Sequence, residues 1–223
     1  MSAAGSGSGV PGGCQGVAYL VQTMDRLRAP GGCPWDAAQD HLSLVRHLLE
    51  EAYEAADAIE SGDRQELREE LGDVLLQVVF HAAIAASEPD PFNLDDIANE
   101  VADKLVRRHP QVFGPAEDSS AALTPDQAHA RWDQIKAQEK ARTSVLDGIP
   151  LAQSALARAQ KVVARAKRAG LEVKTNQNDG LGERLIGTVR LAESQGLDAE
   201  TELRQATRSL EKQIMQLENQ GKD

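Results

Sequence analysis

The stretch that decides the fold reads His47-Leu-Leu-Glu50-Glu51-Ala-Tyr-Glu54, followed after fifteen residues by Glu70-Leu-Gly-Asp73. At about 100° per residue in a helix, His47, Glu51 and Glu54 fall on one face beside an apolar stripe. Glu70 and Asp73 lie in the same way beside the apolar stripe of the next run. The pattern predicts two amphipathic helices, at residues 41–60 and 63–86, each with carboxylates next to its buried side.

The connection between these helices is short. Ser61-Gly62-Asp63 ends the first helix and caps the second, and Glu66 is placed to complete a capping box. Helices joined by so short a turn pack antiparallel, so both carboxylate rows lie beside the seam and face one another. Clustered carboxylate oxygens are the ligands that Mg²⁺ prefers, with Mn²⁺ as a possible substitute.

An acidic helix face can also be merely solvated. Here the acids adjoin Leu, Val and Ile, and no cation occurs between Leu48 and Ile59. Unpaired acids crowded beside a core repel one another unless a cation or a proton neutralises them. The sequence therefore favours a metal site formed by Glu51, Glu54, Glu70 and Asp73 over a solvated face.

Composition excludes several classes of partner. The chain has 223 residues and a net charge of −11, which argues against nonspecific binding to nucleic acid or to anionic membranes. No run approaches the length of a membrane span, and the Gly/Ser-rich residues 1–16 are expected to be a flexible tail. Two cysteines in a chain of this size suggest a reducing, cytoplasmic location without a disulfide framework.

Strand signals are absent, and apolar periodicity predicts an all-α antiparallel helical bundle. Further helices are expected at residues 17–28, 93–108, 126–140, 151–169, 180–195 and 198–218. The C-terminal apolar stripes, such as Leu203, Leu210 and Ile214, need a partner surface, which predicts a homodimer.

Two further features are candidates for substrate binding. Trp35 lies in a Gly- and Pro-rich loop, where its ring is either a plug over the helix ends or a flat surface for a nucleobase. Asp36 is expected to cap the segment that follows. Lys104 and Arg108 are four residues apart on one helix face and could hold phosphates, although cations in a last turn are also ordinary dipole partners.

The C-terminal third is similar to the first part of the chain. Leu71-Gly72-Asp73 matches Leu181-Gly182-Glu183 in the same helix order, but only nine residues separate Gly170 from Gly180. The helix that would carry Glu-Glu-x-x-Glu has no room there. We therefore expect a catalytic domain at residues 17–140 and a truncated, structural second copy at 141–223.

Taken together, these motifs resemble the MazG family of all-α nucleoside triphosphate pyrophosphohydrolases. The resemblance rests on the two acidic runs, on Gly32-Cys-Pro-Trp-Asp36, on Asp103-Lys104-Leu-Val-Arg107-Arg108-His-Pro110 and on Arg131-Trp-Asp-Gln-Ile-Lys136. It implies hydrolysis of nucleoside triphosphates between the α and β phosphates. Longer family members carry two full copies, and this sequence departs from them in its truncated second copy.

The resemblance also implies roles for single residues. Glu51, Glu54, Glu70 and Asp73 would hold Mg²⁺, Lys104 and Arg108 would contact phosphates, and Trp132 would lie near the base. Glu50 is either a base or orienting group or a solvent-facing acid; His47 could reach a phosphate, and His81 is expected to be a satisfied core polar residue.

Two other functions are alternatives to this one. A di-iron bundle needs Glu-x-x-His, which does not occur. A helical interaction module with an acidic metal-binding face is the non-enzymatic alternative.

Overall fold

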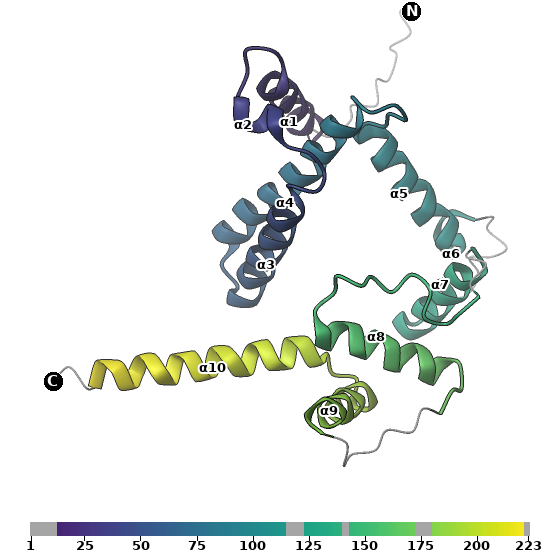
Figure 1. The fold of residues 1–223 in the computed structure, drawn as a ribbon. Helices are drawn as coiled ribbons and strands as arrows, with labels where there is room; N and C mark the ends of the chain where they lie inside the picture. The colour runs from purple at the N-terminus through teal and green to yellow at the C-terminus, as the bar shows by residue number, and fades with distance from the viewer. Residues whose placement is uncertain (1–12, 115–122, 140–142, 173–179, 221–223) are drawn as a thin grey trace, which may run out of the picture. The chain divides into compact units, whose positions relative to one another are not determined.

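The computed structural model describes residues 13–114, 123–139, 143–172 and 180–220. All regular elements in these ranges are helices, so the expected all-α fold is confirmed (Figure 1). The first helix, α1 (Gly13–Arg28), begins four residues earlier than expected, and the rest of the predicted tail lies outside the described residues. The chain divides into two compact units between Thr124 and Pro125, and each unit is described by itself.

The first unit is built on the predicted hairpin, α3 (Val45–Ser61) and α4 (Arg64–Ala85), which pack against each other (Figure 1). Gly62 ends α3 in the left-handed conformation, at φ +78°, which glycine adopts without steric cost. Asp63 caps α4 by accepting from the backbone N–H groups of Gln65 and Glu66. The predicted capping box is wrong in one half: the Asp63 N–H donates to Ser61 Oγ at 3.2 Å and not to the Glu66 side chain.

The core of this unit lies around the C-terminal half of α4. It consists of buried side chains from α1, from α4 and from the residue before α3, namely Met24, Leu44, Val79, Phe80 and Ile84. Helix α5 (Leu94–Arg108) packs against α4, and its first residue, Leu94, rests on this core. Asn93 and Asp96 form a full capping box at its start, and α6 (Pro110–Phe113) follows. The core thus fixes one end of the hairpin, whereas Glu70 and Asp73 lie in the other half of α4.

The segment before α3 differs from the sequence expectation. Residues 34–38 form a short helix, α2 (Pro34–Ala38), so Trp35 is helical and does not lie in a loop. Asp36 lies in the first turn of α2 and does not cap α3, which begins at Val45. Between the two helices, Asp40 and Ser43 bond each other reciprocally, because Ser43 N donates to Asp40 Oδ1 and Asp40 N donates to Ser43 Oγ. A polar turn therefore takes the place of the expected first turn of α3.

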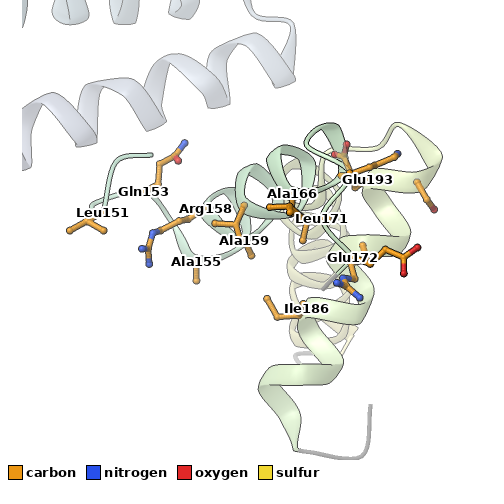
Figure 2. Close-up of a pocket in the computed structure, with 16 residues that line it drawn as sticks. Leu151, Gln153, Ala155, Arg158, Ala159, Ala166, Leu171, Glu172, Ile186 and Glu193 are labelled. Atoms are coloured by element: carbon orange, nitrogen blue, oxygen red, sulfur yellow. The ribbon is translucent and has the colours of Figure 1, made fainter. Parts of the chain in front are cut away.

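The second unit contains α7 (Pro125–Glu139), α8 (Ala155–Arg168), α9 (Leu181–Gln195) and α10 (Ala199–Gln220). Helices α8, α9 and α10 pack on one another, with Val189 and Ala166 buried between them. A cavity of about 1420 Å³ lies along α8 and α9 and is lined by apolar side chains such as Val162 and Ile186 (Figure 2).

Three further expectations concern the domain boundary, the shortened second copy and membrane spans. The predicted boundary at residue 140 stays a prediction, because the compact units describe packing and not internal duplication. Most of the segment between Gly170 and Gly180, where the second copy was expected to lack a helix, lies outside the described residues. Within the described ranges, no helix combines the length and apolarity that crossing a lipid bilayer requires.

Candidate active site

Three carboxylates meet across the α3–α4 hairpin. Glu51 of α3 and Glu70 and Asp73 of α4 each offer an oxygen within 4.8 Å of the others, and all three side chains are half-buried. They meet because Glu70 and Asp73 are one turn apart on α4 and the Gly62–Asp63 turn sets α3 against that face. We call Glu51, Glu70 and Asp73 the acid trio. It confirms the convergence of the two carboxylate rows, though not the ligand roles assigned to them.

Glu54 lies next to the acid trio but is not part of it. Its side chain is exposed, and its carboxylate acts on both Glu51 and Glu70. It also shares a hydrogen bond with the Glu51 carboxyl. Glu54 therefore adds negative charge at the rim of the site, and its predicted role as a ligand stays a prediction.

Burial and like charge both disfavour ionisation of the acid trio. Partial burial is the largest cause that raises the pKa of the Glu51 carboxyl above its usual value, followed by the Asp73 and Glu54 carboxylates. Burial likewise raises the pKa of Glu70 first, and the Glu54 and Asp73 carboxylates add to it. The charges that contribute most to these two shifts all belong to other described acids. Such a set of hard oxygen donors fits a divalent cation, which would relieve the repulsion.

Glu50 and His47 lie beside the acid trio on α3. Glu50 Oε2 is 3.6 Å from His47 Nδ1, and the Glu50 side chain is 62% exposed. Of the alternatives for Glu50, the structure shows a solvent-facing acid paired with a histidine, and a role as a base stays a prediction. His47 is more protected, at 25% exposure, and its Nε2 lies 3.2 Å from Arg46 Nε.

The Trp35 ring joins His47 to the core. It meets the His47 ring edge-on at 6.0 Å between centroids and the Phe80 ring edge-on at 6.4 Å. Arg28 lies over the Phe80 ring, with its guanidinium carbon 5.4 Å from the ring centroid. Trp35 is nevertheless 52% exposed, so it contacts the core and still offers surface to a ligand.

Lys104 and Arg108 are not brought to the acid trio by the packing of the first unit. Within the described residues, α5 packs against α4 and α6 and not against α3. Its contact with the core is at Leu94, and Lys104 lies about 15 Å further along the helix axis. Lys104 is half-buried and Arg108 is buried. Their roles as phosphate ligands stay predictions.

Trp132, the residue predicted to lie near the base, belongs to α7 in the second unit. Its ring is half-buried, and Lys136 Nζ lies 4.5 Å from the ring centroid in a cation–π contact. None of the residues predicted for the site lines the cavity along α8 and α9. Nor does the described part of the second unit contain a group of acids like the acid trio; Glu183 lies alone in the first turn of α9.

Sequence reasoning missed one pair of residues at the end of the hairpin. His41, in the turn before α3, and His81 of α4 stack at 5.0 Å with ring planes 11° apart. Their Nδ1 atoms are 2.7 Å apart, which is hydrogen-bond distance. His81 was expected to be a satisfied core polar residue, and it is satisfied, by His41. Helix periodicity gave no signal for this pair, because His41 lies outside any helix and 40 positions away.

Comparison with known proteins places these features in a family. A family model described as the MazG nucleotide pyrophosphohydrolase domain matches residues 39–113, which include the whole acid trio. A nucleoside triphosphate pyrophosphohydrolase of Escherichia coli K12 is 38% identical over 232 aligned residues, covering 89% of this chain and 86% of that protein. The chain belongs to the MazG family.

Two other MazG-family relatives differ in length from one another. A Thermotoga maritima protein named nucleoside triphosphate pyrophosphohydrolase/pyrophosphatase MazG is 34% identical, covering 89% of this chain and 84% of its own. A nucleoside triphosphate pyrophosphohydrolase of Mycolicibacterium smegmatis is 50% identical over 155 residues, or 68% of this chain. The present chain spans only 46% of that longer protein.

Proposed function

We propose that this MazG-family chain hydrolyses nucleoside triphosphates between the α and β phosphates, as a house-cleaning enzyme of the nucleotide pool. The products are a nucleoside monophosphate and pyrophosphate. In this reaction one water oxygen forms a new P–O bond while the α–β bridging P–O bond breaks, and the water loses a proton. The single observation that carries the proposal is the acid trio, set across a hairpin that lies within the MazG match.

An acidic protein needs a cation to bind a triphosphate, because each partner repels the other. Mg²⁺, or Mn²⁺ in its place, would neutralise phosphate charge and activate water at such a site. Glu51, Glu70 and Asp73 would hold it, and Glu54 at the rim would add a fourth carboxylate. The raised pKa values of Glu51 and Glu70 support this assignment, because they reflect burial first and neighbouring acids after it, and a bound cation would offset both.

The remaining groups are assigned by what they offer chemically. Glu50 is the candidate to accept the proton of the attacking water or to orient a ligand. His47 is assigned to a phosphate contact, since it lies on the same helix face as Glu51. Lys104 and Arg108 supply cations for the phosphates.

The nucleobase has two candidate contacts, which lie in different units. Trp35 offers its half-exposed ring for stacking beside His47. Trp132 is assigned to the base by family resemblance alone.

A homodimer completes this proposal. The hairpin exposes large apolar side chains that an isolated surface rarely carries in such number: Leu48, Leu49, Tyr53, Ile59, Leu71 and Leu75. A twofold-related copy would cover such a face with the same face. Because α5 does not pack on α3 in the described chain, Lys104 and Arg108 reach the phosphates either by closure of α5 or from the second copy. A cytoplasmic location also remains part of the proposal.

The experiment is a product analysis. The purified chain is incubated with nucleoside triphosphates and Mg²⁺, with and without EDTA, and pyrophosphate and orthophosphate are measured separately. Pyrophosphate and monophosphate in equal amounts, abolished by EDTA, support the proposal. Orthophosphate as the only product, or turnover that survives chelation, contradicts it; metal binding without turnover favours the interaction module instead.

A further inference from the structure

The histidine pair (His41 and His81) connects two parts of the first unit that the chain separates. His41 lies in the turn between α2, which carries Trp35, and α3, which carries His47 and Glu51. His81 lies on α4, directly after Phe80. The 2.7 Å contact between the two Nδ1 atoms therefore ties the α2–α3 connection to α4.

Phe80 and His81 hold this connection at adjacent points. The Phe80 ring makes a T-shaped contact with the Trp35 ring, with 6.4 Å between centroids. The His81 ring contacts the His41 ring, with 5.0 Å between centroids. Within the connection, Gln39 Nε2 donates to Trp35 O and Ser43 Oγ donates to Gln39 Oε1. These bonds link Gln39 and Ser43, on either side of His41, to the backbone of Trp35.

The contact between the two Nδ1 atoms limits how many protons the pair can carry. A hydrogen bond between them needs one Nδ1 that carries a proton and one that accepts. Two neutral rings satisfy this requirement, and so does one protonated ring beside a neutral ring. When both rings are protonated, neither Nδ1 can accept, and two like charges face each other 5.0 Å apart.

The surroundings of the pair are consistent with resistance to a second proton. Burial and, after it, the His41 charge lower the pKa of His81 below its usual value. Glu88 Oε1, just beyond α4, lies 3.5 Å from His41 Nε2. Two charged residues lie on neighbouring elements. Arg28 of α1 lies over Phe80, and Asp96 at the start of α5 accepts a hydrogen bond from Asn93 N. Among the causes that lower the pKa of His81, His41 is the one charged group.

We propose that His41 and His81 are positioning residues for substrate binding. Their hydrogen bond holds the α2–α3 connection on α4, and this connection orients Trp35 and His47 for contact with a nucleotide bound at the acid trio. The inference rests on the proposed function, because it assigns Trp35 and His47 to the nucleotide. It predicts that substrate affinity falls on acidification, when a second proton breaks the pair, while the chemical step at the acid trio changes less.

The test compares three full-length proteins between pH 5 and pH 8: wild type, His81→Leu and His81→Asn. Leu fills the space without a hydrogen bond, whereas the Asn amide can donate to or accept from His41 Nδ1 and does not titrate in this range. KM and kcat for a nucleoside triphosphate are measured with Mg²⁺. Thermal unfolding at each pH confirms that each variant is folded, and titration of the substrate phosphate is common to all three.

At pH 7.5 we expect His81→Leu to raise KM about fivefold, roughly the effect of one net hydrogen bond, with kcat within about twofold of wild type. His81→Asn should keep the wild-type KM at pH 7.5. Between pH 7.5 and pH 5, its KM should rise less than the KM of wild type. An unchanged KM in folded His81→Leu, or a full acid-side rise in His81→Asn, overturns the inference.

A second readout does not depend on turnover. Nitrogen NMR of histidine-labelled protein at pH 7.5 should show an Nδ1–H tautomer for one ring of the pair in wild type, because this bond requires it. That signal should be lost in His81→Leu, where His41 has no acceptor. If wild type showed the tautomer but released no pyrophosphate, the proposed function would fail and the histidine pair would stand. If the enzyme released pyrophosphate but wild type lacked the tautomer, the proposed function would stand and the inference about the histidine pair would fail.

Discussion

Glu51 of α3 and Asp73 of α4, 22 positions apart in sequence, each place a carboxylate oxygen within 4.8 Å of the other across the hairpin. Glu70 completes the trio, and the charges among the main causes that raise the pKa of Glu51 and of Glu70 are all described acids. The fold thus keeps like charges together at a cost in stability.

Glu51→Gln should separate stability from metal binding. Removing one of three crowded charges relieves repulsion, so the metal-free variant should melt at the wild-type temperature or slightly above it. The rise in melting temperature on adding Mg²⁺ should be largely lost, because binding to the native state stabilises by mass action. Glu69→Gln, an exposed neighbour on α4 outside the acid trio, is the matched control. A full Mg²⁺-induced shift in Glu51→Gln would place the metal elsewhere.

Stability without metal should depend on pH through Glu51 and Glu70. Both carboxyls have pKa values raised above 4.5, so the native state binds protons before the unfolded state does. Their contribution is fully present below about pH 4.5, the unfolded value, and is lost as the pH rises through the higher native pKa. The effect is expected to be small, because the site is partly open to solvent.

The measurement for this prediction is urea unfolding in EDTA at pH 5 and at pH 7.5. The loss of stability between the two should be smaller in a Glu51→Gln, Glu70→Gln double variant than in wild type. An identical loss in both proteins would show that these two groups do not carry the dependence.

The apolar stripe of α10 should act in association, together with the apolar face of the hairpin, and not in folding of the single chain. Leu210 is 57% exposed, so the destabilisation expected for a buried leucine does not apply to it. Leu210→Asp should shift the mass measured by light scattering toward the monomer and leave the melting temperature of that monomer within a few degrees of wild type. Gln205→Asp, on the opposite face of the same helix, is the control. A wild-type mass for Leu210→Asp would remove this surface from the dimer.

The hairpin was predictable because its information is local. Apolar and acidic residues recur at helical spacing, and Gly62 and Asp63 supply the turn. The acid trio then follows from geometry, since a short turn leaves one way to pack the two faces. Glu54 was expected on the same face of α3 as Glu51, but its side chain is exposed at the rim of the site. Periodicity predicts the helix face on which a residue lies and not how deeply its side chain is buried.

What escaped prediction depends on contacts between distant segments. The short helix α2 carries Trp35, and its first turn contains Pro34, which a loop and a helix start both tolerate. The histidine pair joins a turn to a helix 40 positions away, and no periodic pattern reports such a contact. The course of α5 was equally hidden: among the described residues, Leu94 at the start of α5 packs against the core, and α5 does not contact α3.

The central claim is that chemistry resides in the acid trio of the first unit and not in the second unit. It is tested most directly by pyrophosphate release from a nucleoside triphosphate with Mg²⁺, measured for Asp73→Ala and for Glu183→Ala. Glu183 is the residue that the expected second copy aligns with Asp73, and it belongs to no group of three acids like the acid trio within the described residues. We predict that Asp73→Ala loses turnover by at least about a hundredfold while staying folded, and that Glu183→Ala retains it. Wild-type turnover in Asp73→Ala, or loss of turnover in a folded Glu183→Ala, would contradict the account.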